Sequence, residues 1–148
     1  MIKVPVINIV HHNFNENENL KTVLTGGLWT GEIPELNENE TPVSMPYGKI
    51  ELESARNEYI LSSSYIEHSK VNLLIYSTSR DELNNIVATF EKEWNYRDTD
   101  FYIPDDVDTS FMHLMQIEKS LMTEFIRDKE GNQVYSSSLS YEITLFRQ

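Results

Sequence analysis

Alternation of apolar and polar side chains predicts a pair of strands in the middle of the chain. From Tyr47 to Ser54 apolar residues alternate with charged ones, which gives one apolar face and one charged face. A second alternating run extends from Tyr65 to Ser77. The polar pair Asn57-Glu58 between them has the composition of a turn, so we expect two antiparallel neighbours.

A longer hairpin is predicted near the C-terminus. Phe111 to Arg127 and Val134 to Phe146 both alternate, and Asp128 to Asn132 supplies turn residues between them. Each run has 13 residues or more, whereas strands usually have about five or six. We therefore expect part of this hairpin, about residues 111–146, to project beyond the sheet or to pair with another subunit.

The apolar period changes to that of a helix between the two strand pairs. Ser79-Arg80-Asp81-Glu82 has the form of a capping box, in which the serine and the glutamate each bond a backbone amide. The apolar residues that follow fall on one helical stripe: Leu83, Ile86, Val87, Phe90 and Trp94. This stripe predicts a long amphipathic helix of about 15 residues packed on one face of the sheet.

The first third of the chain contains shorter patterns. Met1 to Val10 alternates loosely, which indicates a short strand or an N-terminal arm over residues 1–15 that docks on a neighbour. Helical spacing begins at Leu20 and stops at Gly26-Gly27, which predicts a short N-terminal helix with these glycines as its C-cap. Residues 30–46 contain several prolines and an Asn/Glu run, so we expect a long exposed loop there.

Together these elements predict a single α+β domain over residues 1–148. It should hold a mostly antiparallel β-sheet, a long amphipathic helix packed on one face and a short N-terminal helix. The absence of cysteine excludes disulfides, thiolate metal sites and a cysteine nucleophile. Since no apolar run has the length of a membrane helix or of a signal-peptide core, we expect a soluble protein that folds inside the cell.

The charge balance is strongly acidic. The chain carries 24 acidic and 12 basic side chains, for a net charge of −12. Such a surface repels phosphates, so sequence-specific DNA binding is not expected. An acidic channel wall would, however, let a duplex slide past without sticking.

The polar residues form no pattern of a catalytic or metal site. The four histidines, at positions 11, 12, 68 and 113, lack the spacing that places two imidazoles on one helical face. The acidic run at 105–108 lacks the glycine and the distal glutamate of a calcium loop. No phosphate-loop lysine follows Gly26-Gly27, and no nucleophile-elbow glycines flank the serine triplets. We therefore expect no catalytic residue, cofactor or metal, and no enzymatic activity.

A methionine-rich strand is the candidate contact surface. Methionine packs against irregular partners, so this strand fits a subunit interface, although core packing alone also explains it. The candidate interface residues are Phe111, Met112, Met115, Met122, Phe125 and Tyr47.

The order of these elements resembles one family of virion proteins. A helix is followed by a glycine-containing stretch (Gly26 to Pro34), a strand opened by Pro46-Tyr47, a second strand with a tyrosine-rich start, the Ser79 to Trp94 helix and two closing strands. This order resembles the tail terminator, or tail completion, proteins of long-tailed bacteriophages and related minor tail proteins. The resemblance covers roughly Leu20 to Phe146. The chain departs from it in a short N-terminal helix and in the lengthy segment Asn95 to Ser110.

The resemblance implies a structural subunit of a ring, commonly a hexamer. Such a ring caps the tail tube, halts its polymerisation and joins it to the head-side connector. Its partners would be copies of itself, the tail tube protein and the neck proteins, while genomic DNA passes through the lumen without specific binding. The ring would lie in the tail or neck of the virion, with no membrane contact, after assembly in the bacterial host cytoplasm. Overlong strands and a terminal arm suit the head-to-tail contacts of a cyclic assembly.

Two other functions remain open at the level of sequence. One is a head-completion or neck adaptor protein of the same kind of particle. The other is a ligand-binding or enzymatic α+β domain with its site beside Trp29, Trp94 and Tyr102. An enzyme would require convergent polar groups in a deep pocket, whereas a ring protein requires extended interfaces.

Overall fold

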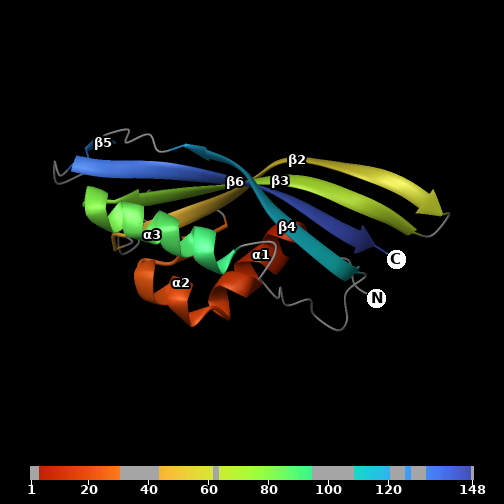
Figure 1. Ribbon diagram of the computed structural model, residues 1–148, viewed down its shortest axis with the longest axis horizontal. Coiled ribbons are helices and arrows are strands. Elements are labelled where there is room, and N and C mark those ends of the chain that lie inside the picture. Colours follow the sequence, from red (N-terminus) through yellow and green to blue (C-terminus); the bar gives the residue numbers. More distant parts are fainter. Residues whose placement is uncertain are drawn as a thin grey trace, which may run out of the picture.

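The fold consists of three helices and a β-sheet, seen in a computed structural model that describes residues 4–30, 44–61, 64–94, 109–120, 126–127 and 133–147 (Figure 1). The elements in chain order are α1 (Val6–Asn15), α2 (Glu18–Val23), β1 (Leu28–Trp29), β2 (Tyr47–Leu61), β3 (Ser64–Ser77), α3 (Arg80–Glu93), β4 (Thr109–Ser120), β5 (Ile126–Arg127) and β6 (Gln133–Arg147). The predicted α+β class is confirmed. The expected loop at residues 30–46 lies mostly outside the described residues.

The sheet has the strand order β1-β2-β3-β6-β4, with β5 paired to the end of β6. All the pairs are antiparallel except β1 with β2, which is parallel. The predicted pairing of the two C-terminal strands is confirmed, because β4 pairs with β6 from Thr109 opposite Arg147 to Ser120 opposite Ser138. The predicted turn at residues 128–132 lies outside the described residues.

The helices gather on one face of the sheet, and the core lies between the two layers (Figure 1). α3 buries Leu83, Ile86, Val87 and Phe90, so the predicted stripe faces the sheet. Ser79 caps the helix by accepting from the Glu82 amide at 3.3 Å, while the Glu82 carboxylate accepts from the Ser77 hydroxyl at 2.7 Å. With 14 residues α3 is of ordinary length and not the long helix that was predicted.

The N-terminal prediction was wrong, because residues 6–15 form helix α1 and neither a strand nor a free arm. Pro5 precedes the helix at its N-cap, and the buried residues that follow are Val6, Ile9, Val10, Asn13 and Phe14. Their spacing of three and four positions is helical, and the Phe14 ring stacks on Phe90 of α3 at 6.3 Å between centroids. The packing of α1 against the core therefore outweighs the loose alternation of the sequence.

The short helix predicted from Leu20 to the glycines is confirmed as α2, but the glycines have another role. α2 ends at Val23 with Leu24 as its C-cap, before Gly26 is reached. Gly26 donates its amide to Pro46 O at 2.7 Å, and a side chain there would collide with the Ser44 and Pro46 carbonyls. Gly27 has a φ of +88°, which favours glycine. The pair thus allows the chain before β1 to approach the start of β2 closely.

The central hairpin is longer than the sequence indicated, while the end of the C-terminal hairpin lies outside the described residues, so its projection stays a prediction. β2 continues through the predicted turn, with Asn57 opposite Glu67, and ends at Leu61. A register shift between Leu52 and Ser54 changes the phase of the alternation there, which made the second half of β2 resemble a turn. β6 is instead an interior strand between β3 and β4. The β2–β3 hairpin extends beyond the helices (Figure 1).

Candidate subunit interface

The second half of β2 is an open sheet edge. β1 pairs with β2 at only two positions, Gly48 and Lys49. Beyond them, no strand of the described part of the chain pairs with the outer side of β2. All residues from Glu51 to Ile60 are exposed. An exposed edge of this length presents a row of unpaired backbone groups, which is a template for another strand.

Apolar side chains lie along this edge. Leu52 is 48%, Ile60 50% and Tyr59 73% exposed, and these are the large exposed hydrophobic residues of the described chain. Tyr59 pairs across the hairpin with Tyr65, with 5.5 Å between ring centroids. Isolated exposed apolar residues are common, but three on one strand with an open side indicate a contact surface.

The carboxylates of β2 are paired within the protomer. Glu51 lies 3.0 Å from Lys49, Glu53 lies 2.9 Å from Lys70, and Glu58 lies 3.0 Å from the His68 imidazole. Such exposed pairs each contribute less than about 1 kcal/mol to stability. The two lysine partners reduce the net charge along the edge, and this lowers the repulsion that an approaching chain would meet.

A hollow of about 250 Å³ adjoins the edge on the helix side. It is lined by Pro5, Val6, Ile7, Leu52, Ala55, Glu67, Ser69 and Arg147. Arg147 is completely buried, and its guanidinium donates to Val4 O at 2.8 Å and to the Glu67 carboxylate at 2.9 Å. The last described residue of the chain is thereby fixed to the segment that precedes α1.

The interface residues predicted from sequence are only partly described. Phe111, Met112 and Met115 lie on β4, the strand at the opposite margin of the sheet, and their side chains are outside the description. Met122 and Phe125 lie outside the described residues altogether. Tyr47 is 5% exposed and contacts Tyr76 across the hairpin, at 5.1 Å between ring centroids. Its ring therefore offers little surface to another subunit, while the role of the methionine-rich strand stays a prediction.

The exposed half of β2 was missed by the sequence analysis. Its signal was the run Tyr59-Ile60-Leu61, an apolar cluster directly after polar residues. Because a turn was expected at Asn57-Glu58, this run was not recognised as the continuation of the strand.

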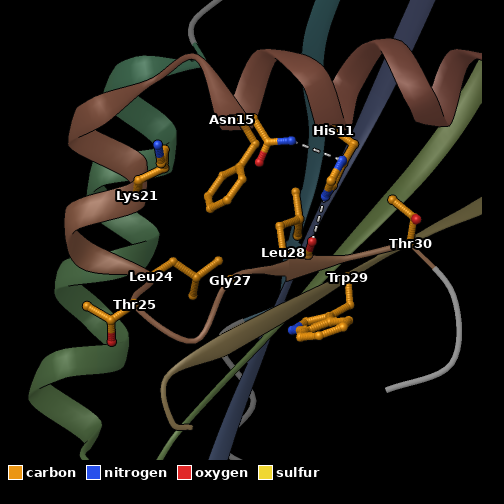
Figure 2. A pocket seen from close by; sticks show the side chains of 10 residues that line it. His11, Asn15, Lys21, Leu24, Thr25, Gly27, Leu28, Trp29 and Thr30 are labelled. Atoms are coloured by element: carbon orange, nitrogen blue, oxygen red, sulfur yellow. Dashed lines mark hydrogen bonds between the residues drawn. The ribbon is translucent and has the colours of Figure 1, made fainter. Parts of the chain in front are cut away.

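A second, larger hollow lies between α1, α2 and β1 (Figure 2). It has a volume of about 460 Å³ and includes His11, Lys21 and Trp29 in its lining. His11 points toward β1, with its Nε2 2.8 Å from Leu28 O and its Nδ1 3.3 Å from the Asn15 amide nitrogen. One ring nitrogen thus joins α1 to β1, and the other contacts Asn15 one turn further along the same helix. This histidine therefore has a structural role here.

Trp29 and Trp94, which were expected to line one ligand-binding cleft, do not lie in the same hollow. Trp94 is buried in the core, edge-on to Phe90 and Tyr141, and does not line the hollow beside Trp29. Tyr102 lies outside the described residues. Burial, assisted by the nearby Glu91 carboxylate, raises the pKa of Tyr141 above its ordinary value, so this phenol stays neutral at physiological pH.

Within the described ranges, no three His, Asp or Glu side chains lie close enough together to hold a metal ion. Likewise, no helix in the described part of the chain is long and apolar enough to cross a membrane. The aspartate run at 105–108 lies outside these ranges.

Comparison with known proteins identifies the fold. No protein-family model and no curated protein sequence matches this chain. Its fold is similar to that of a chain in a solved structure described as the virion of a native gene transfer agent particle, with a TM-score of 0.63. The match covers 95% of this chain and 94% of that chain, at 7% sequence identity. At that identity, the likeness demonstrates a shared fold over nearly the full length of both chains.

Proposed function

We propose that this chain is a structural subunit of a phage-like virion, and that it forms the tail terminator ring. In this role the subunits would have no catalytic activity and would form a homo-oligomeric ring, a hexamer, that caps the tail tube and joins it to the head-side connector. The observation that carries the proposal is the shared fold with a chain of a gene transfer agent virion, over 95% of this chain.

The order of elements supports the terminator role within such a particle. The strand that follows Pro46-Tyr47, the capped helix α3 and the closing strands β4 and β6 correspond to the elements on which the resemblance to tail terminators rests. The long open edge of β2 gives the subunit a surface for contacts with a neighbour. A ring needs two different contact surfaces on each subunit, and the two margins of one sheet supply them.

The charge of the chain supports a position around a DNA channel. A subunit with a net charge of −12 presents DNA with a repulsive surface in any ring that it builds. DNA that passes through such a lumen would not be held by phosphate contacts.

The first experiment measures the mass of the purified protein by light scattering, over a range of concentration and salt. We expect a closed ring of one size, formed alone or on the tail tube protein of the same virion. In a second arm, the protein is added to polymerising tail tube protein and tube lengths are measured by negative-stain electron microscopy. A terminator stops elongation, so tubes should stay short and carry a ring at one end.

Two outcomes would contradict the terminator role. A protein that binds the connector ring but leaves tube length unchanged would be a neck adaptor. A monomer at every concentration that ignores both tube and neck proteins would remove the structural role itself.

A further inference from the structure

The sheet ends in two strands with an open side. Among the described strands, β4 pairs with β6 alone, and β2 beyond Lys49 pairs with β3 alone. At its start, β2 already accepts a strand, since the Gly48 amide donates to Gly27 O of the chain entering β1 at 2.9 Å. Beyond Lys49 the outer amide and carbonyl groups of β2 have no pairing strand among those described.

The two open edges match in length. β2 has 15 residues and β4 has 12, and the part of β2 that follows Lys49 runs from Ile50 to Leu61, the same length as β4. At about 3.3 Å per residue, each edge extends for roughly 40 Å. One edge can therefore cover the other without leaving an overhang.

The strand directions also match. β2 is antiparallel to β3, β3 to β6 and β6 to β4, so β2 and β4 point in opposite directions. When a second copy is placed beside the first in the same orientation, β4 of one copy lies antiparallel to β2 of the next. The contact would then continue the pairing of the sheet, in its more stable antiparallel form.

We propose that β2 of one subunit, from Ile50 to Leu61, pairs with β4 of the next subunit and so forms the contact that closes the ring. This inference rests on the proposed function, because it assigns the interface of that ring. The contact is head-to-tail, which is the type that generates a ring, whereas β2 against β2 would stop at a dimer. It would also cover Leu52, Tyr59 and Ile60.

Charge favours β4 over a second β2 as the partner. From Ile50 to Leu61, β2 contains three glutamates and one arginine, Glu51, Glu53, Glu58 and Arg56. Two such strands side by side would bring six carboxylates and only two arginines together. Lys49 and Lys70 offset part of this charge in each subunit, but the carboxylates still outnumber the arginines, and like charges on neighbouring strands are destabilising. β4 contains one acidic and one basic residue, Glu118 and Lys119. It therefore adds no net charge to the contact.

The absence of cysteine permits a direct test in the full-length protein. Single cysteines are placed on β2 as Arg56→Cys or Glu58→Cys, and on β4 as His113→Cys or Met115→Cys. A variant of each strand is mixed before assembly and treated with a short bismaleimide crosslinker, which tolerates small differences in register. Asn84→Cys, at an exposed position of α3, is the matched control.

We expect a crosslinked dimer only when a β2 variant is mixed with a β4 variant. A chain with both cysteines should give a ladder of bands that ends at the ring size measured by light scattering. Dimers from a β2 variant alone would overturn the proposal in favour of a two-fold contact. Rings without any β2–β4 crosslink would overturn it while leaving the proposed function in place. If no ring forms, alone or on the tail tube, the proposed function fails with it.

Discussion

Removal of the Phe90 ring tests the contact between α1 and α3. Phe90 is completely buried, and its ring lies between Phe14 of α1 and the indole of Trp94. The centroid distances are 6.3 Å to Phe14 and 5.1 Å to Trp94. Phe90→Ala removes both contacts and leaves a cavity between two helices. The variant is therefore expected to fold with a large loss of stability.

The magnitude follows from burial and aromatic contact. A buried phenylalanine replaced by alanine lowers the free energy of unfolding by about 3–5 kcal/mol. Each aromatic pair adds about 0.5–1.5 kcal/mol to what burial alone provides. We therefore expect a loss of stability in the upper half of the range of about 3–5 kcal/mol. For a domain of this size the melting temperature would fall by roughly 8–20 °C.

Urea unfolding followed by tryptophan fluorescence and circular dichroism measures this loss. Asn84→Ala, on the exposed side of the same helix, is the control and should change stability by less than about 0.5 kcal/mol. In a double-mutant cycle, Phe14→Ala and Phe90→Ala should be coupled by about 0.5 kcal/mol or more. A loss below about 1 kcal/mol for Phe90→Ala would mean that the stripe is exposed. Full additivity in the cycle would mean that α1 does not pack on α3.

Three further variants test other parts of the fold. Arg147→Ala leaves the Glu67 carboxylate unpaired in a nearly buried position, so thermal unfolding should show a loss of about 3–5 kcal/mol, and Arg147→Met with Glu67→Leu should recover much of it. Asn17→Ala removes the cap of α2 and should lower the urea stability by about 1 kcal/mol, whereas no change would argue against the cap. Gly26→Ala places a methyl group against the Ser44 carbonyl and should abolish soluble folded protein, as judged by circular dichroism.

The elements predicted best from sequence are those that local residues determine. The cap at Ser79 and the stripe that ends at Phe90 lie within one helix, and both are seen in α3. The strand from Tyr65 to Ser77 is also well predicted, because Val71, Leu73 and Ile75 alternate on one face and β3 runs from Ser64 to Ser77. In these segments local preference and tertiary packing agree.

The prediction failed where packing decides the structure. Val4, which precedes α1, and Val6, its first residue, are in phase as in a strand. The buried face of α1 also includes the polar Asn13, which donates to Ile9 O at 2.8 Å. Its helical form depends on distant partners such as Phe90, which a local window does not contain. Similarly, the bulge after Leu52 changes the phase of the alternation in β2, so the alternation pattern does not predict the second half of the strand.

The candidate interface is harder to predict from the sequence than a single helix or strand, because whether a strand lies at an edge depends on the order of strands in the sheet. Interior and edge strands can share the same alternation, and β2 is an edge only because β1 is too short to cover it. Proteins that remain monomeric commonly guard such edges with proline or with charges that point inward. From Ile50 to Leu61 β2 contains no proline, and its three glutamates are paired with neighbouring basic or imidazole side chains. The edge does have register shifts after Leu52 and after Tyr59, but over this length they are its main protection. Such an edge favours a subunit that is covered by another strand in its assembled state.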